Sequence, residues 1–288
     1  MATQNAANQT HGTRATQLKS IVYGAAVGDA LGVPFEFQAR DTFTCTQMAS
    51  GGAHGMPAGT FSDDTSLLIA TCDSIRACNG TIDLKDMAAR FRAWLHQGAY
   101  TADGTVFDVG NATATALNEG KGQSGERSNG NGSLMRIAPL ALTSATDSQI
   151  AKVSAITHAH PISTTACVVF VHIVQDVLRG IDLPAAIRSH IPDDQRFSFL
   201  EDVEAKTRDE IQSSGFVLHT LEAALWCTLR TKSYAECVLE AVNLGSDTDT
   251  TACVAGALAG AMYGYDAIPQ QWVETLRGKS VIDACLFA

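Results

Sequence analysis

Charged residues are scarce in this chain, and basic ones are scarcer than acidic ones. They make up 17% of its 288 residues, with 20 Lys and Arg against 30 Asp and Glu, which gives a formal net charge of −10. A protein that tracks the phosphates of a nucleic acid needs clustered Lys and Arg, so the composition argues against that class. It is still compatible with a small phosphate-bearing ligand, because metals, backbone N–H groups and helix N-termini can hold one.

The usual signals for export, membrane insertion and zinc binding are also missing. Residues 1–12 are polar and lack the apolar core of a secretory signal, and the longest apolar run, 166–171, is too short to cross a membrane. The eight cysteines show no Cys-x-x-Cys or Cys/His zinc spacing, and most of them lie in apolar, helix-like stretches. A free thiol in such a place behaves as a small hydrophobe. We therefore expect a reduced, cytoplasmic protein with no membrane partner.

Alternating strand patterns bounded by turns are hard to find, whereas helical periodicity is widespread. Apolar residues within 84–95 follow helical spacing closely. Residues 233–236 read Ser-Tyr-Ala-Glu, the pattern of a capping box, and predict a helix that runs to about residue 244. The Val and Ile content of 164–179 would suit a strand, but its length favours a buried helix. The sequence predicts an all-α protein.

Composition and spacing indicate one domain with a dense core. Hydrophobic residues make up 45% of the chain, and 288 residues are ample for a large core. Gly256, Gly260 and Gly264 recur every fourth residue, which permits close contact between helices. We expect a polar tail at residues 1–17 and a single domain at residues 18–288.

Two acidic clusters, far apart in the chain, each open an apolar, helix-like stretch. They contain Ser62, Asp63 and Asp64 in the first, and Asp247, Asp249 and Thr250 in the second. Helix capping explains either cluster alone, because Asp, Ser and Thr accept hydrogen bonds from free N–H groups at helix starts. Together they hold more acids than caps need, and four Asp side chains in one site would repel one another unless cations neutralised them. Since carboxylates and hydroxyls are the ligands that Mg²⁺ prefers, the pair favours a two-metal centre.

A glycine-rich loop spans residues 120–132. It does not contain the Gly-x-x-x-x-Gly-Lys-Ser/Thr pattern of a P-loop. Its end leads into the apolar segment 134–139, and successive glycines at a helix N-terminus expose N–H groups that can bind an anion. A solvated linker followed by a helix cap is the other interpretation, and the residues alone do not decide between the two.

Four motifs, in order and in register, resemble the ADP-ribosylglycohydrolase family over about residues 18–277. They are Gly28–Gly32 with Phe35–Glu36, Ser62–Thr65, Gly130–Ser133 with Met135–Arg136, and Asp247–Thr250. Within the family, the bacterial members are the most similar. The resemblance implies a single compact, orthogonal multi-helix bundle with a dinuclear Mg²⁺ or Mn²⁺ site in a cleft. It also implies hydrolysis of the bond between ADP-ribose and an acceptor.

Carried over residue by residue, the resemblance implies a set of metal ligands. They are Ser62, Asp63, Asp64, Asp247, Asp249 and Thr250. Relatives often have Thr where Ser62 stands and Gly where Ser246 stands, and Ser62 keeps the ligating oxygen. Gly245 and Ser246 are placed with the substrate-binding residues beside this site.

The resemblance also implies three candidate catalytic carboxylates. Glu36 matches an acid on a mobile loop that covers the metals, and Asp108 matches an acid that points at the distal ribose. Asp249, among the metal ligands, is the third. Which carboxylate is the general base is left open.

Further matches concern substrate binding. Phe216 would stack on adenine, for which a ring in the core is the alternative interpretation, and His219 stands where relatives often carry an acid. His158 would support the substrate, because the metals already have oxygen ligands. The pyrophosphate would be bound by the glycine-rich segment, with Gly130, Asn131, Gly132, Ser133 and Met135 as candidates.

The predicted function is removal of ADP-ribose from ADP-ribosylated arginine in a protein, by a monomeric, metal-dependent hydrolase that releases ADP-ribose. Another acceptor, namely serine, an acetyl group or a nucleic acid, is the first alternative, and a non-catalytic ADP-ribose binder is the second. Intact metal ligands favour an enzyme over a binder. The sequence does not identify the target protein, nor does it choose between Mg²⁺ and Mn²⁺.

Overall fold

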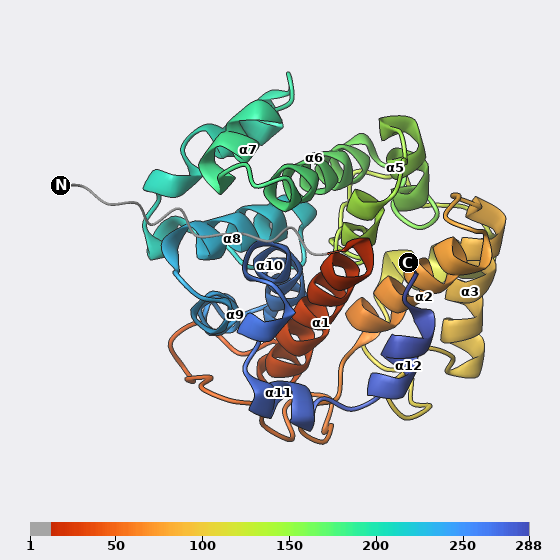
Figure 1. The fold of residues 1–288 in the computed structure, drawn as a ribbon, viewed down its shortest axis with the longest axis horizontal. Helices are drawn as coiled ribbons and strands as arrows, with labels where there is room; N and C mark the ends of the chain where they lie inside the picture. The colour runs from red at the N-terminus through yellow and green to blue at the C-terminus, as the bar shows by residue number, and fades with distance from the viewer. Residues whose placement is uncertain (1–12, 288) are drawn as a thin grey trace.

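The computed structural model describes residues 13–287, and within this range it contains helices but no β-strand (Figure 1). The α-helices are α1 (Arg14–Gly32), α2 (Asp63–Ala77), α3 (Leu84–Gln97), α4 (Asn111–Glu119), α5 (Asp147–Ser154), α6 (Pro161–Leu178), α7 (Leu183–Ser189), α8 (Val217–Arg230), α9 (Tyr234–Asn243), α10 (Thr248–Tyr263), α11 (Gln270–Thr275) and α12 (Lys279–Cys285). The all-α prediction is confirmed. Helix α1 begins before Leu18, where the domain was expected to start, and residues 1–12 of the expected tail lie outside the described range.

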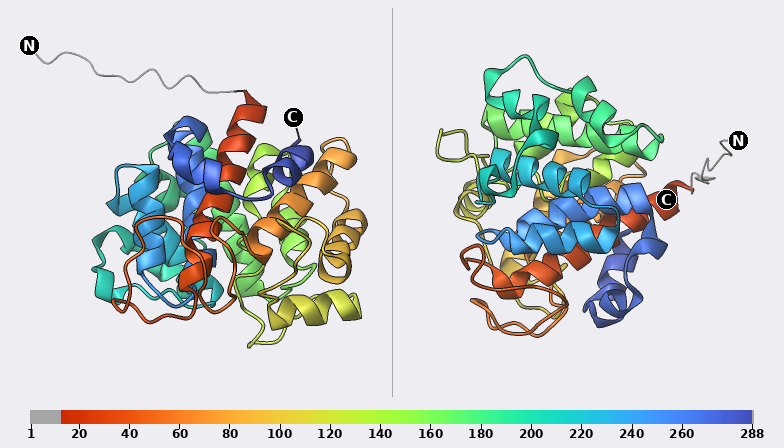
Figure 2. Two further views of the ribbon diagram at one scale, coloured as in Figure 1. Left: turned by 90° about the horizontal axis from the view of Figure 1, so that it is seen from below. Right: turned by 90° about the vertical axis from the view of Figure 1, so that its left-hand side faces the viewer.

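Helices α1 and α10 form the centre of the fold, and both are buried along nearly their whole length. In Figure 1, α8, α9 and α10 lie on one side of α1, and α2, α3 and α12 lie on the other. Helices α5, α6 and α7 occupy the upper edge of the same view. Both views of Figure 2 place the start of α1 and the C-terminal end of the chain on the same side of the molecule.

Three glycines let the backbone of α1 approach that of α10. Gly24, Gly28 and Gly32 lie four residues apart, and therefore on one face of α1. A Cβ atom at Gly28 would lie 2.1 Å from the carbonyl oxygen of Ala252, and one at Gly32 would lie 2.3 Å from the Cα of Asp249. Neither separation is sterically allowed. The absence of side chains on this face is thus a condition for the contact between the two helices.

Of the three glycines predicted to permit close helix contact, two lie in such a contact. A Cβ at Gly256 would lie 2.2 Å from the carbonyl oxygen of Gly24, and one at Gly260 would lie 2.2 Å from that of Ser20. Gly264 has a different role. It follows the last residue of α10 with φ of 84°, a conformation that favours glycine, and no atom lies near its missing Cβ.

The helices predicted from periodicity and capping are present. Helix α3 buries Met87, Phe91 and Trp94 on one face. Helix α9 begins after Ser233, whose hydroxyl accepts a hydrogen bond from the N–H of Glu236 at 3.2 Å. The return bond of the expected capping box is shifted by one residue, because the Glu236 carboxylate accepts from the N–H of Lys232.

Helix α6 confirms the buried helix expected at 164–179 and is more extensive than its apolar run suggested. Its 18 residues have a mean hydropathy of 1.5, so its length and composition alone would permit it to cross a membrane. Half of that stretch is buried inside the protein, as in a core helix. All eight cysteines lie within the described range and are free thiols.

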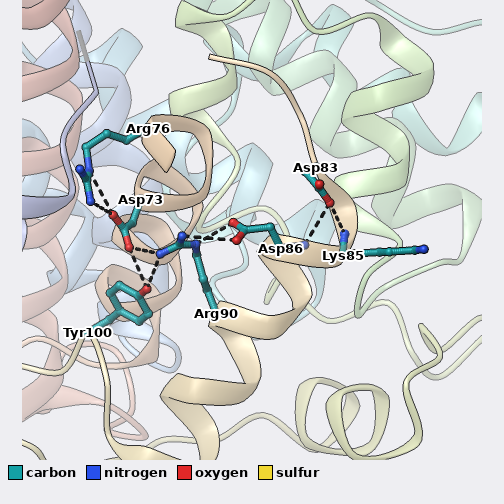
Figure 3. A network of polar contacts seen from close by, with 7 residues as sticks. All are labelled: Asp73, Arg76, Asp83, Lys85, Asp86, Arg90 and Tyr100. Carbon is teal, nitrogen blue, oxygen red and sulfur yellow. Dashed lines mark hydrogen bonds and ion pairs between the residues drawn. The ribbon is translucent and has the colours of Figure 1, made fainter. Parts of the chain in front are cut away.

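A polar network joins α2 to α3 (Figure 3). Asp73 on α2 accepts hydrogen bonds from Arg76 at 2.5 Å and from the hydroxyl of Tyr100 at 2.9 Å, and it pairs with Arg90 on α3. Arg90 in turn pairs with Asp86 at 2.7 Å. Because Asp73 is almost fully buried, these charge-assisted bonds fix the position of α3 against α2. Helix α2 is the one that begins with the acids of the first cluster.

We expect Gly28→Ala to lower the free energy of unfolding by about 1–3 kcal/mol or more, the usual cost of overpacking a core. The added methyl group would meet the backbone of α10, which cannot move aside as a side chain can. Chemical denaturation measures the change. Gly125→Ala is the matched control, because a Cβ there would lie 3.6 Å from Ser128 Oγ, an ordinary contact. Equal stabilities of the two variants would contradict the proposed constraint.

Candidate active site

The N-termini of α2 and α10 bring the two acidic clusters together. The hydroxyl of Ser62 donates to Asp64 Oδ2 at 2.8 Å, and the hydroxyl of Thr250 lies 3.3 Å from the same oxygen. Capping does not account for these acids. Ser62 alone caps α2, by accepting from the N–H of Asp64, and Asp247 precedes α10 without making a side-chain capping bond. The remaining carboxylates are therefore available for another role.

Several of these carboxylate oxygens are buried without a hydrogen-bond partner. They are Oδ1 of Asp64, Oδ1 of Asp247 and both oxygens of Asp249. A buried, unpaired carboxylate is costly, and burial accordingly raises the pKa of Asp63, Asp64 and Asp249 well above the usual range. Oxygen ligands of this kind fit a hard divalent cation, which would supply the missing partner.

Asp29 on α1 belongs to the same cluster, although it was not among the residues predicted for the site. Its carboxylate accepts from the N–H of Ser62 at 2.9 Å and from the hydroxyl of Thr65 at 2.6 Å. Carboxylate oxygens of Asp29, Asp64 and Asp249 lie within 4.8 Å of one another. Burial raises the pKa of Asp29 to about 6, opposed by the bonds from Thr65 and Ser62. The sequence did contain a signal, because Asp29 lies within the Gly28–Gly32 motif of the family resemblance, but no role was assigned to it.

A second group of titratable residues consists of Glu36, His54 and Asp108. His54 Nε2 lies 2.5 Å from Glu36 Oε2 and 4.0 Å from Asp108 Oδ1. Burial, followed by the charge of Asp108, raises the pKa of Glu36 to about 9. Asp108 has a backbone φ of 53°, which is uncommon for residues other than glycine but accessible to Asp. His54 was missed in the sequence, where it lies in an irregular loop without a recognisable motif.

The loop that carries Glu36 is anchored to the second acidic cluster. The N–H of Phe37 donates to the carbonyl oxygen of Ser246 at 2.8 Å, and the N–H of Ser246 donates to the carbonyl oxygen of Gln38, also at 2.8 Å. Ser246 itself has φ of 64° and Gly245 has φ of 76°. In this structure, the pair predicted to bind substrate therefore connects the Glu36 loop to the start of α10.

A cavity of about 260 Å³ joins these groups to the glycine-rich segment. It is lined by residues from both acidic groups and from the predicted substrate-binding set, including Glu36, Asp63, Asp108, Arg127, Gly130, Asn131, Gly132, Met135, His158, Asp247 and Thr250. Ser62, Asp64 and Asp249 lie outside this lining, as buried residues. Arg127 is the one Arg or Lys in the lining, and it was not predicted for the site. The structure thus places segments from most of the chain around one space.

The glycine-rich segment is ordered by bonds to α8 and α10 rather than by a helix of its own. Asn131 Nδ2 donates to Asp247 Oδ2 and to Thr220 Oγ1, each at 2.9 Å, and the Asn131 N–H donates to Gly215 O at 3.0 Å. The expectation that a helix N-terminus follows this segment is wrong. Residues 131–137 form successive turns, and a 3₁₀ helix, η2 (Ala138–Leu142), begins only afterwards, with Pro139 in its first turn.

Besides Gly245 and Ser246, two further residues predicted to bind substrate, Ser133 and Phe216, do not line the cavity. Ser133 is buried, and its hydroxyl accepts from Ser154 Oγ at 2.9 Å. Phe216 precedes α8 and is partly buried, with its ring 5.0 Å from that of His219 in an edge-to-face arrangement. The Phe216 backbone forms a bridge with Gly130 and therefore lies beside the glycine-rich segment.

His158 lines the cavity as a neutral imidazole whose Nε2 faces the glycine-rich segment. Arg136 donates to Thr157 Oγ1 at 3.0 Å, and that oxygen lies 2.8 Å from His158 Nδ1. Since Arg136 can only donate, the Thr157 oxygen accepts from it, and a second bond joins the same hydroxyl to Nδ1. Burial, followed by the charge of Arg136, lowers the pKa of His158 to about 3. A Cβ at Gly130 would lie 3.4 Å from Nε2, so this nitrogen of the neutral ring faces the glycine-rich backbone.

Comparisons with known proteins identify the family of this chain. The sequence profile of the family described as ADP-ribosylglycohydrolase matches residues 10–287. The ADP-ribosylarginine hydrolase Tri1 of Pseudomonas putida (strain GB-1) is 35% identical over 272 residues, which cover 89% of this chain and 73% of that protein. The ADP-ribosyl-dinitrogen reductase glycohydrolase of Rhodospirillum rubrum is 30% identical over 274 residues, which cover 89% of this chain and 88% of that protein.

A solved structure described as an ADP-ribosylglycohydrolase-related protein complex shares the fold. Its TM-score is 0.79 at 31% identity, and the match covers 94% of this chain and 96% of that one. The chain therefore belongs to the ADP-ribosylglycohydrolase family, and it is a hydrolase that acts on glycosidic bonds.

We expect the stability of the cation-free protein to fall as pH rises. The folded-state pKa values of Asp29, about 6, and Glu36, about 9, lie above their ordinary values of 3.8 and 4.5. The folded state thus binds protons that the unfolded state has lost, and unfolding becomes easier between about pH 4 and pH 9. Thermal denaturation in chelator, from pH 5 to pH 8, measures this slope. A melting temperature that rises over the same range would contradict it.

Asp63→Asn provides the matched variant for the same experiment. Burial and the charge of Asp64 raise the pKa of Asp63, so removal of this charge should stabilise the cation-free protein, and by more at pH 8 than at pH 5. Added Mg²⁺ should stabilise the wild type more than the variant. Glu201→Gln, at an exposed acid in the 3₁₀ helix η3 (Gln195–Glu201), is the control and should respond as the wild type does.

Proposed function

We propose that this protein removes ADP-ribose from ADP-ribosylated arginine in other proteins, with two divalent cations bound by the acids at the starts of α2 and α10. The observation that supports the proposal most directly is the set of buried carboxylate oxygens without partners beside a cavity that also contains glycine backbone and a cationic side chain. Relatives named ADP-ribosylarginine hydrolase, 35% and 32% identical, support arginine as the acceptor.

The residues proposed to hold the cations are those predicted from the sequence. They are Ser62, Asp63, Asp64, Asp247, Asp249 and Thr250, which offer only oxygen atoms, as Mg²⁺ and Mn²⁺ prefer. When bound, the cations would neutralise these carboxylates, hold ribose hydroxyls and lower the pKa of a water molecule. Asp29 already accepts three hydrogen bonds from Ser62 and Thr65, so we assign it to positioning the first cluster.

The substrate would lie with its pyrophosphate at the glycine-rich segment. Gly130 and Gly132 offer backbone at the cavity wall, and His158 Nε2 offers a neutral hydrogen-bonding group there. Arg127 supplies the positive charge that a pyrophosphate requires among many acids. Phe216 lies next to the same segment, where its ring could stack on the adenine.

The proton chemistry is assigned to those of the three candidate catalytic carboxylates that line the cavity. Glu36 and Asp108 do so, whereas Asp249 does not, and we therefore place Asp249 with the cations. The bond between the anomeric carbon and the guanidinium nitrogen breaks through an oxocarbenium-like state, and the nitrogen keeps the electron pair. The water oxygen then bonds to that carbon. Glu36, which holds a proton because its pKa is raised, gives that proton to the departing guanidine, which leaves as guanidinium, and its carboxylate then takes the proton of the water.

The test is incubation of the protein with peptides ADP-ribosylated on arginine or on serine and with O-acetyl-ADP-ribose, each with and without Mg²⁺. We expect release of ADP-ribose from the arginine peptide only when Mg²⁺ is present. Glu36→Gln should lower kcat by about 10²- to 10⁴-fold, the usual contribution of a general base, while ADP-ribose affinity stays within a few-fold. Glu201→Gln is the control. Hydrolysis of the serine or acetyl substrate alone would exclude arginine as the acceptor.

We further expect Phe216→Ala to weaken ADP-ribose binding by about 1–3 kcal/mol, as for other rings that stack on a base. Calorimetry with ADP-ribose measures the change. Phe199→Ala, at another partly buried phenylalanine, is the control and should lower stability without changing affinity. Should Phe216→Ala behave in the same way as that control, the ring would belong to the core and not to the ligand site.

A further inference from the structure

Phe37 is an exposed aromatic residue directly after the candidate catalytic acid Glu36. Its side chain is 68% exposed, and among the described residues only one other large hydrophobic side chain, Ile181 at 41%, is exposed. Isolated apolar residues on a surface are common and need no explanation. Two further observations distinguish Phe37 from such a residue: its backbone conformation and its aromatic neighbours.

The backbone at Phe37 is held in an unfavourable conformation. Its φ is 67°, a region that bulky side chains rarely adopt and that costs of the order of 1–3 kcal/mol. The two hydrogen bonds between this loop and Ser246 hold it there, at 2.8 Å each. The loop therefore fixes the position of the ring relative to the acids at the start of α10. A glycine would satisfy the same backbone without strain, but it would not provide a ring.

Phe37, His54 and Phe107 form a row of rings, here called the aromatic rim. The ring of Phe37 lies 5.9 Å from that of His54, which lies 5.1 Å from that of Phe107. Phe37 directly follows Glu36, Phe107 directly precedes Asp108, and His54 contacts both acids. The aromatic rim thus borders the pair of carboxylates that line the cavity.

We propose that the aromatic rim binds the guanidinium group of the acceptor arginine, with Phe37 as the residue that determines this specificity. The inference rests on the proposed function and names the group that the same site would recognise outside the ADP-ribose. A guanidinium is planar and cationic, and it stacks on aromatic faces while it pairs with carboxylates. Rings beside Glu36 and Asp108 offer both interactions. A serine or acetyl acceptor is uncharged and can form neither the cation–aromatic contact nor the ion pair.

The space beside Phe37 also suits an acceptor that belongs to a protein chain. Phe37 and Ser246 line an open cavity of about 470 Å³ next to the one described above. Arg40 is the only Lys or Arg in that lining, and it donates to the carbonyl oxygens of Leu244 at 2.9 Å, Arg208 at 2.6 Å and Ile211 at 2.5 Å. Because its donors are engaged in these bonds, Arg40 serves the fold and does not compete for the carboxylates.

The experiment compares Phe37→Ala, Phe37→Gly and Phe37→Tyr with the wild type. On a peptide ADP-ribosylated on arginine, the first two should lower kcat/KM by about 2- to 30-fold, the range for a cation over an aromatic face, and Phe37→Tyr should retain activity. The affinity for free ADP-ribose should not change in any variant. Phe37→Gly should melt no earlier than the wild type, which shows that the loss is not a folding defect. Ile181→Ala is the control for loss of an exposed apolar side chain.

A binding measurement keeps the inference separate from the proposed function. We expect N-acetyl-arginine amide to bind the wild type more tightly than its neutral analogue, N-acetyl-citrulline amide, and Phe37→Ala to abolish that difference. Weaker ADP-ribose binding in Phe37→Ala would overturn the inference and make the ring a platform for the base. Equal binding of the two amides by the wild type would also overturn it. A wild type that releases no ADP-ribose from arginine would refute the proposed function, and the amide comparison would still decide whether the rim recognises guanidinium.

Discussion

Direct backbone contact between α1 and α10 is the constraint on which the rest of the structure depends. Gly32, the last residue of α1, meets the backbone of Asp249 with no room for a Cβ. That contact sets Asp29 on α1 beside Asp249 on α10, and Asp29 then holds the start of α2 through Ser62 and Thr65. A small change in the distance between α1 and α10 would therefore also change the distances between the carboxylates.

The two groups of acids have different surroundings and so different chemistry. Asp64 and Asp249 are fully buried, and several of their oxygens lack a partner, which suits permanent ligands of a cation. Glu36 lines the cavity and contacts His54, which suits a group that exchanges protons with a substrate. The anchoring of the Glu36 loop to Ser246 connects the two groups. Access to the cavity and contact with His54, rather than residue type, thus distinguish Glu36 from Asp64 and Asp249.

The sequence was most informative where chemistry and local structure coincide. The helices followed from periodicity, and the two acidic clusters were visible because each holds two acids within three residues at a helix start. Asp29 lies within the Gly28–Gly32 motif, but a single acid in an apolar helix gives no local indication of its role, and it was not assigned to the site. His54 and Arg127 lie in irregular loops, whose paths depend on distant contacts. The turns after Asn131 also depend on tertiary bonds, to Gly215 and Asp247, which no local propensity encodes.

The distribution of the acids along the chain has a consequence for synthesis. Asp63 and Asp64 emerge from the ribosome early, whereas Asp247 and Asp249 emerge only when most of the chain has been made. Until α10 docks against α1, the early acids lack the neighbours that create their crowded, dehydrated surroundings, so a nascent or truncated chain has only ordinary exposed carboxylates. Competence to act on a glycosidic bond is therefore acquired late in synthesis, when α10 docks against α1.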